Sequence, residues 1–139
     1  MARTIARDHD EKRDHIRRTA ARVFARDGFD RASMSLLARE CGVSKANLYH
    51  YYDGKDAILY DLLRAYLISL RDRVCQGPHD ALPPRERLRA AVLEILRAYQ
   101  GEDDVHRLQI NGFAMLPEDQ QRELRGYHRE LYLLSLIHI

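Results

Sequence analysis

Side chains that could contact a nucleic acid are concentrated between residues 45 and 50, in the segment KANLYH. Its lysine and asparagine can hydrogen-bond base edges or phosphates, and its tyrosine offers a flat apolar edge to a thymine methyl group. On a helix, the spacing of Leu48 and Tyr52 turns both of them inward. The outer side then carries Lys45, Ala46, Asn47, Tyr49 and His50. This pattern predicts a helix that reads DNA.

A second helix must hold that reading helix at a fixed angle. Residues 35–41 are predicted to form it, with Leu37, Ala38 and Cys41 on its inner face. Gly42 makes the tight turn, and Val43 fills the angle between the two helices. Ser44 is a good N-cap for the reading helix, which is expected to continue to about residue 51. Together these segments predict a helix-turn-helix.

Several of these side chains also have a plain structural interpretation. The tyrosines at 49, 51 and 52 could form a packed aromatic cluster, an interpretation kept for Tyr52 and in part for Tyr51, whereas Tyr49 is assigned to DNA. His50 could be an ordinary surface histidine, but its place in the motif favours a contact with a phosphate or a base. The first helix has a basic face that is solvated or places one side chain on a phosphate: Arg13, Arg17, Arg18, Arg22 and Arg26.

The charge distribution agrees with a nucleic-acid-binding N-terminal part. Residues 1–55 carry 12 Lys and Arg against 8 Asp and Glu, whereas residues 56–139 carry 11 against 13. No apolar run of membrane-spanning length and no signal peptide is visible, so a cytoplasmic protein is expected. Cys41 and Cys75 match no metal or redox motif and are expected to be reduced thiols with a structural role.

The periodicity predicts an all-α chain of about seven helices. The first is expected over 10–27, with Asp8 and Glu11 as a capping box before it and Gly28 as its stop. A long fourth helix is expected from residue 55 to about 77–78. A fifth begins at 83–84, a sixth covers 103–116, and a seventh follows Pro117. The buried face of the fifth is predicted to consist of Leu88, Val92, Ile95, Leu96 and Tyr99.

The segment GFDRASMSLLARECGVSKANLYHYYDGKDAIL, residues 28–59, resembles the DNA-binding domain of the TetR/AcrR family of bacterial regulators. The resemblance implies a DNA-binding domain over residues 1–54 and an incomplete helical domain for ligand sensing and dimerisation over residues 55–139. It places the residues of the reading helix in the major groove. It also assigns Ser33, Tyr51 and Lys55 mostly to phosphates, and Ser35 to a base or the backbone.

The resemblance further implies how such a protein acts. A homodimer binds a palindromic operator on double-stranded DNA, and a small-molecule effector releases it, so that most members are repressors. The residues expected in the effector pocket are Leu96, Tyr99, His106, Phe113 and Tyr127. Most apolar residues at helical spacing are simply core, so Tyr99 and His106 are the favoured polar anchors.

Two other functions were weighed. An enzyme needs convergent catalytic groups, and the acidic cluster at 102–104 is interpreted as the start of a helix, so no enzymatic activity, cofactor or metal site is expected. The second alternative is a DNA-binding module without a working sensing domain. The ending LYLLSLIHI loses the polar alternation of the turns before it, and two long dimerisation helices of the family are not seen. A gene fragment or an unrelated tail is the expectation for this end.

Overall fold

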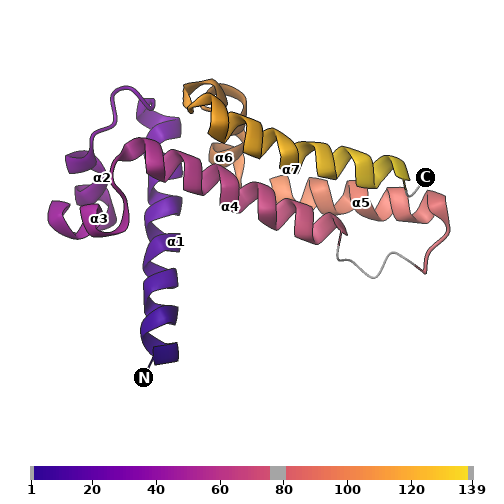
Figure 1. Ribbon diagram of the computed structural model, residues 1–139, viewed down its shortest axis with the longest axis horizontal. Coiled ribbons are helices and arrows are strands. Elements are labelled where there is room, and N and C mark those ends of the chain that lie inside the picture. Colours follow the sequence, from indigo (N-terminus) through magenta and orange to yellow (C-terminus); the bar gives the residue numbers. More distant parts are fainter. Residues whose placement is uncertain (1, 76–80, 138–139) are drawn as a thin grey trace.

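The computed structural model describes residues 2–75 and 81–137, and over them the fold is entirely helical, as predicted (Figure 1). Three helices form the N-terminal head, with the short second and third helices beside one end of the long first one. These helices are α1 (Ala2–Asp27), α2 (Met34–Cys41) and α3 (Lys45–Tyr51).

The rest of the chain forms an elongated body. In Figure 1, α4 leaves the head across α1, and α5 and α7 run beside it, while α6 lies close to α1. The body consists of α4 (Lys55–Cys75), α5 (Pro84–Tyr99), α6 (Asp103–Asn111), a short 3-10 turn (Phe113–Met115) and α7 (Glu118–Ile137). The predicted break at Gly77 and Pro78, and the last two residues of the apolar tail, lie outside the described residues.

The first helix is longer than predicted. It begins at Ala2, so the capping box expected at Asp8 and Glu11 is wrong, because both residues lie inside the helix. Their carboxylates instead form ion pairs one turn away, with Lys12 at 3.0 Å and Arg7 at 2.9 Å. Such pairs at i,i+4 support a helix in a charged segment that contains no glycine or proline.

A single large hydrophobic core joins the head to the near end of the body. The inward residues predicted for the helix-turn-helix are buried in it, which confirms the inner face assigned to α2 and α3. Side chains from α6 and α7 reach the same core, so the head packs directly on the body. Its largest fully buried side chains are Phe24, Leu37, Leu48, Ile58, Leu59, Leu63, Leu67 and Leu124.

The buried face predicted for α5 is confirmed at Ile95 and wrong at Leu88, Val92 and Leu96. Leu96 is 54% exposed and Val92 is 45% exposed, whereas Ala98 is buried and Ala91 and Ile95 pack beside it. Two apolar stripes run along this helix at suitable spacing, and periodicity alone cannot say which one meets α4. The stripe that packs against α4 is the one formed by Ala91, Ile95 and Ala98.

The sixth helix is shorter than predicted, because it ends at Asn111 and a 3-10 turn covers residues 113–115. Gly112 is buried between these two elements. A Cβ atom at this position would lie 2.8 Å from the carbonyl oxygen of Leu108 and 3.4 Å from Cδ1 of Leu59. The prohibitive contact is with the backbone of α6 itself, so a side chain here would force the end of α6 to shift, whereas Leu59 of α4 lies at about van der Waals distance.

Candidate nucleic-acid interface

Two serines set the starts of the short helices. The Ser33 hydroxyl oxygen accepts a hydrogen bond from the backbone N–H of Leu36 at 3.1 Å, and the Ser44 hydroxyl accepts one from Asn47 at 3.0 Å. Both are N-caps, which satisfy backbone donors that the first turn of a helix leaves free. Ser33 thus has a capping role that the sequence analysis did not assign to it. Its hydroxyl hydrogen remains available to an acceptor outside the protein.

The turn between α2 and α3 depends on Gly42. Its φ angle is +70°, in the left-handed region that favours glycine, and its N–H donates to the carbonyl of Arg39 at 3.2 Å. The N–H of Val43 then donates to the carbonyl of Ala38 at 3.0 Å. The chain can therefore reverse at once, which fixes the angle at which α3 leaves α2.

The two sides of α3 differ sharply in burial. Leu48 is completely buried and anchors the helix to the core, while Tyr49 beside it in the sequence is 45% exposed. Every residue predicted for the outer side is exposed: Lys45, Ala46, Asn47, Tyr49 and His50. Ser33 and Ser35 are exposed as well. The core thus leaves one face of α3 free for a partner.

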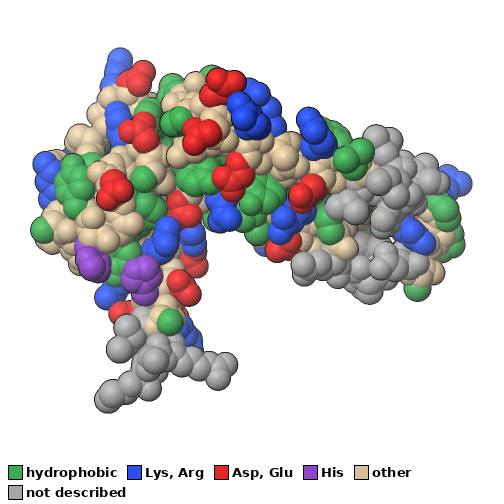
Figure 2. Space-filling model, in the orientation of Figure 1, with side chains coloured by type: hydrophobic (Ala, Val, Ile, Leu, Met, Phe, Trp, Pro, Cys, Tyr) green, Lys and Arg blue, Asp and Glu red, His purple; other side chains and the backbone are tan. Residues whose placement is uncertain are grey.

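The tyrosines that follow behave differently from Tyr49. Tyr51 is half-buried, with its ring centroid 4.9 Å from that of His9 and 5.5 Å from that of His50. The contact with His9 joins α3 to α1, whereas His50 lies on α3 itself. Figure 2 shows histidine side chains close together on the head. Tyr52 is buried, so the inward position predicted for it is confirmed. Tyr51 is partly packed, as expected, and only part of its ring is accessible.

Lys55 has a different role from the one expected. Its ammonium donates hydrogen bonds to the backbone carbonyls of Phe29, Asp30 and Ala32 at 2.8, 3.1 and 3.1 Å, and it lies 4.6 Å from the centroid of the Phe29 ring. Three acceptors use all three donors of an ammonium group. The side chain therefore holds the loop before α2 against the start of α4, and the expected phosphate contact through this ammonium is not supported.

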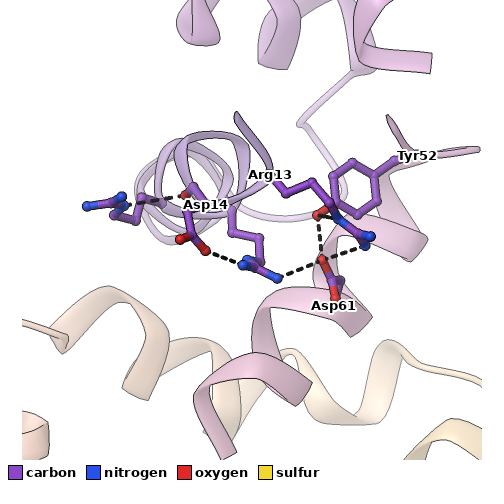
Figure 3. A network of polar contacts seen from close by, with 6 residues as sticks. Arg13, Asp14, Tyr52 and Asp61 are labelled. Carbon is purple, nitrogen blue, oxygen red and sulfur yellow. Dashed lines mark hydrogen bonds and ion pairs between the residues drawn. The ribbon is translucent and has the colours of Figure 1, made fainter. Parts of the chain in front are cut away.

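A polar network joins the head to α4 (Figure 3). The Asp61 carboxylate accepts hydrogen bonds from Arg13 at 3.1 Å, from Arg17 at 3.2 Å and from the Tyr52 hydroxyl. Arg17 also pairs with Asp14 on its own helix. The network links α1, the C-cap of α3 and α4, and therefore fixes the orientation of the reading helix relative to the body.

The Asp61 carboxylate at the centre of this network is half-buried, and hydrogen bonds from its neighbours compensate for its loss of solvent. Burial alone would raise the pKa of Asp61, but the hydrogen bond from Tyr52 and the charges of Arg17 and Arg13 outweigh it, and its pKa is lowered from the ordinary value of 3.8. Burial and the hydrogen bond to Asp61 raise the pKa of Tyr52 to about 12. Asp61 therefore stays ionised at neutral pH.

This role of Arg13 and Arg17 was not predicted from the sequence, in which both residues belong to a basic face expected to be solvated or to place one side chain on a phosphate. Their acidic partner is 48 and 44 residues away in the chain. A helical wheel shows only that the two arginines share one side of α1. No local signal indicates that a carboxylate from another helix faces them.

The residues predicted for an effector pocket have different surroundings. Tyr99 and His106 lie together, with ring centroids 4.6 Å apart, and the buried Nδ1 of His106 has no hydrogen-bond partner among the described residues. Phe113 packs against the main core, and Tyr127 lies under the guanidinium of Arg71. Leu96 is 54% exposed. The pocket assignment remains a prediction.

The described residues offer neither a metal site nor a reactive cysteine. Across residues 2–75 and 81–137, no group of three His, Cys, Asp or Glu side chains could hold a metal ion, and no helix is long and apolar enough to cross a membrane. Cys41 is buried and Cys75 half-buried, and both are free. Burial raises the pKa of both thiols, which keeps them protonated at neutral pH, as suits structural cysteines.

Known proteins share both the sequence and the shape of this chain. The family described as bacterial regulatory proteins, tetR family, matches residues 16–62. The HTH-type transcriptional regulator BetI of Rhizobium meliloti (strain 1021) is 37% identical over 81 residues, which are 58% of this chain and 40% of that protein. The chain spans only 39–57% of the length of this and two other curated relatives.

Solved structures agree with these matches. A TetR-family transcriptional regulator from Bordetella parapertussis 12822 superimposes with a TM-score of 0.82 and 36% identity, over 91% of this chain and 66% of the other. AibR, solved in complex with isovaleryl coenzyme A and operator DNA, gives a TM-score of 0.72 and 25% identity, over 86% of this chain and 65% of the other. The relatives are regulators, which confirms the prediction of a non-enzymatic protein, and the chain belongs to the TetR family of bacterial regulatory proteins.

Proposed function

We propose that this chain is the DNA-reading part of a ligand-responsive transcriptional regulator that binds operator DNA through the outer face of α3. One observation carries the proposal: Lys45, Asn47 and Tyr49 are exposed on one side of a helix that buried Leu48 anchors from the other. A short exposed helix of this kind, held by a second helix, fits the major groove of DNA. AibR, similar over most of this chain, was solved with operator DNA, which supports the proposal.

Each exposed side chain has a proposed task. Lys45 and Asn47 hydrogen-bond base edges or phosphates, and Tyr49 contacts a thymine methyl group. Ala46 keeps the backbone close to the groove because its side chain is small. Ser33, Ser35, His50 and the accessible edge of Tyr51 contact the DNA backbone. Lys55 is assigned to the shape of the head, because its ammonium is occupied by three carbonyls.

The test is binding to a duplex selected from a random library, followed by fluorescence anisotropy at several salt concentrations. Removing one good base contact costs about 1–3 kcal/mol, so Lys45→Ala and Tyr49→Ala should each weaken binding by roughly 5–100-fold. Arg129→Ala, which removes a charge from the exposed surface of α7, is the control and should leave the affinity unchanged. Parent-like affinity in both α3 variants would refute the assignment of this face.

Further parts of the proposal concern the whole regulator. We propose that it acts as a homodimer on a palindromic operator in the bacterial cytoplasm, and that a small molecule releases it as a repressor. The pair of Tyr99 and His106, with its unpartnered ring nitrogen, is the best candidate for a polar anchor of that molecule. AibR was solved with an acyl coenzyme A, which supports a small-molecule effector in this fold.

The competing proposal is a DNA-binding module that neither pairs nor senses a ligand. It is favoured by Leu96, which was predicted to line the effector pocket but is 54% exposed, and a side chain so open to solvent does not close a pocket. Measuring the mass of the 139-residue chain in solution by light scattering separates the two. A dimer supports the paired-head model, and a clean monomer removes it for this chain.

A further inference from the structure

A cavity of about 660 Å³ lies at the joint between head and body, and no residue of the DNA-reading face lines it. It is formed by one face of α1, one face of α4 and the segment that joins α5 to α6. None of Leu96, Tyr99, His106, Phe113 and Tyr127 lines it. Its volume is within the range of small-molecule sites. Ala98, Gln100 and Val105 do line it, so the cavity adjoins the Tyr99–His106 pair without including either ring.

The wall of this cavity is unusually rich in arginine. Five arginines line it against three carboxylates, those of Asp14, Glu102 and Asp104. Arg22 of α1 and Arg73 of α4 are exposed and make no hydrogen bond or ion pair within the described part of the chain. Guanidinium groups without a partner are suited to carboxylate and phosphate groups, which they can bind through two parallel hydrogen bonds.

The floor of the cavity is apolar. Leu62 and Leu70 of α4 and Ala98 of α5 are buried side chains that line it. The cavity therefore combines cationic groups with a surface that water wets poorly. A ligand with a charged group and a compact apolar part would satisfy both.

One buried polar atom supports this interpretation. The Tyr66 hydroxyl is buried in the same wall and has no hydrogen-bond partner among the described residues. Burial raises the pKa of Tyr66 to about 12, so the hydroxyl keeps its proton and can donate it. A buried hydroxyl without a hydrogen-bond partner destabilises the folded chain. A ligand that accepts this hydrogen bond would remove that destabilisation.

We propose that this cavity binds a small amphipathic anion, a phosphate or carboxylate attached to a compact apolar group. Arg22 and Arg73 hold the charge, Tyr66 donates a hydrogen bond, and Leu62 and Leu70 receive the apolar part. Such a ligand touches α1 of the head and α4 and the α5–α6 segment of the body at the same time.

The first experiment measures binding without DNA, by isothermal titration calorimetry of the 139-residue chain with phenyl phosphate. Inorganic phosphate and phenol, which carry the charge and the ring separately, are the matched ligands. Charge-assisted hydrogen bonds contribute about 1.5–3 kcal/mol, so phenyl phosphate should bind at least about tenfold more tightly than either. Equal binding of phenol and phenyl phosphate would overturn the proposal.

Variants test the assigned residues. The double variant Arg22→Gln with Arg73→Gln should weaken phenyl phosphate binding by about tenfold or more. Its control is Arg107→Gln with Arg129→Gln, which removes the same charge from exposed positions outside the cavity and should bind like the parent. Equal weakening in both double variants would mean that the loss of binding reflects net charge alone, and it would refute the assignment of this cavity as the binding site.

Tyr66→Phe gives a readout that a purely structural role would not produce. It should weaken phenyl phosphate binding severalfold while leaving the thermal unfolding temperature of the free chain unchanged or higher, because the hydroxyl has no protein partner to lose. Parent-like affinity in Tyr66→Phe would remove this residue from the site.

Discussion

The two ends of α4 are packed very differently. Near the head, Leu59 and Leu63 are fully buried in a core shared by α1, α2, α3, α6 and α7. At the far end, Leu70 and Val74 belong to a small cluster with Ala98 of α5, and larger apolar side chains of α5 stay exposed. The position of the reading helix is therefore set by the near core, and the far end contributes little to it.

The same contrast holds for polar contacts. The head is fastened by long-range contacts: Asp61 with Arg13 and Arg17, and Lys55 with the loop before α2. The far end has the exposed ion pair of Arg71 with Glu130 at 3.3 Å, a type that contributes about 0–1 kcal/mol. The long-range polar contacts of this fold are therefore concentrated around the helix-turn-helix.

The largest expected effect tests the difference in packing. Leu48→Ala removes the fully buried anchor of α3 and should lower the free energy of unfolding by about 2–5 kcal/mol. Leu96→Ala removes the same atoms from a side chain that is 54% exposed and should change it by no more than about 0.5 kcal/mol. Urea unfolding followed by circular dichroism measures both. Similar losses would show that the far end is packed as well as the head.

A smaller effect is expected from the polar network. Asp61→Asn keeps the shape of the side chain but removes the charge that Arg13 and Arg17 contact, and it should cost about 1–3 kcal/mol at pH 7. DNA affinity should also fall, because the network orients α3. The matched control is Glu130→Gln at the far end, whose effect on stability should be under about 1 kcal/mol.

The pH dependence of this variant gives a second check. The pKa of Asp61 is lowered in the folded chain, so its carboxylate stabilises the fold at pH values above the ordinary pKa of 3.8. That contribution is lost as the pH falls below 3.8 through the folded value, because the carboxyl is then protonated in both states. The stability difference between parent and Asp61→Asn should therefore shrink from pH 5 to pH 2. A difference independent of pH would contradict the role assigned to the charge.

The smallest expected effects come from one substitution made at two glycines. Gly42→Ala places a Cβ at φ +70°, where an L-residue is strained by about 1–2 kcal/mol, although the surrounding space is open. Gly126→Ala inside α7 meets no atom either and has no positive φ, so it should stabilise the chain by about 0.5–1 kcal/mol. Thermal unfolding of the two variants measures both shifts. The same sign in both would refute the turn geometry of the head.

The sequence by itself determined the helical class, the turn at Gly42, and the division of α3 into a buried and an exposed side. These features depend on residues within about one helical turn of each other, where spacing decides which side chains share a face. The N-cap at Ser44 and the inward position of Tyr52 were predictable for the same reason.

Tertiary structure decided the rest. Lys55 meets carbonyls 23 to 26 residues away, and Asp61 meets arginines 44 and 48 residues away, so no local pattern could assign them. The stripe of α5 that faces α4, and the cavity between α1, α4 and α5, exist only once distant helices pack together. Periodicity identifies the faces of a helix, and the packing of neighbouring helices selects which face is buried and which side chains meet.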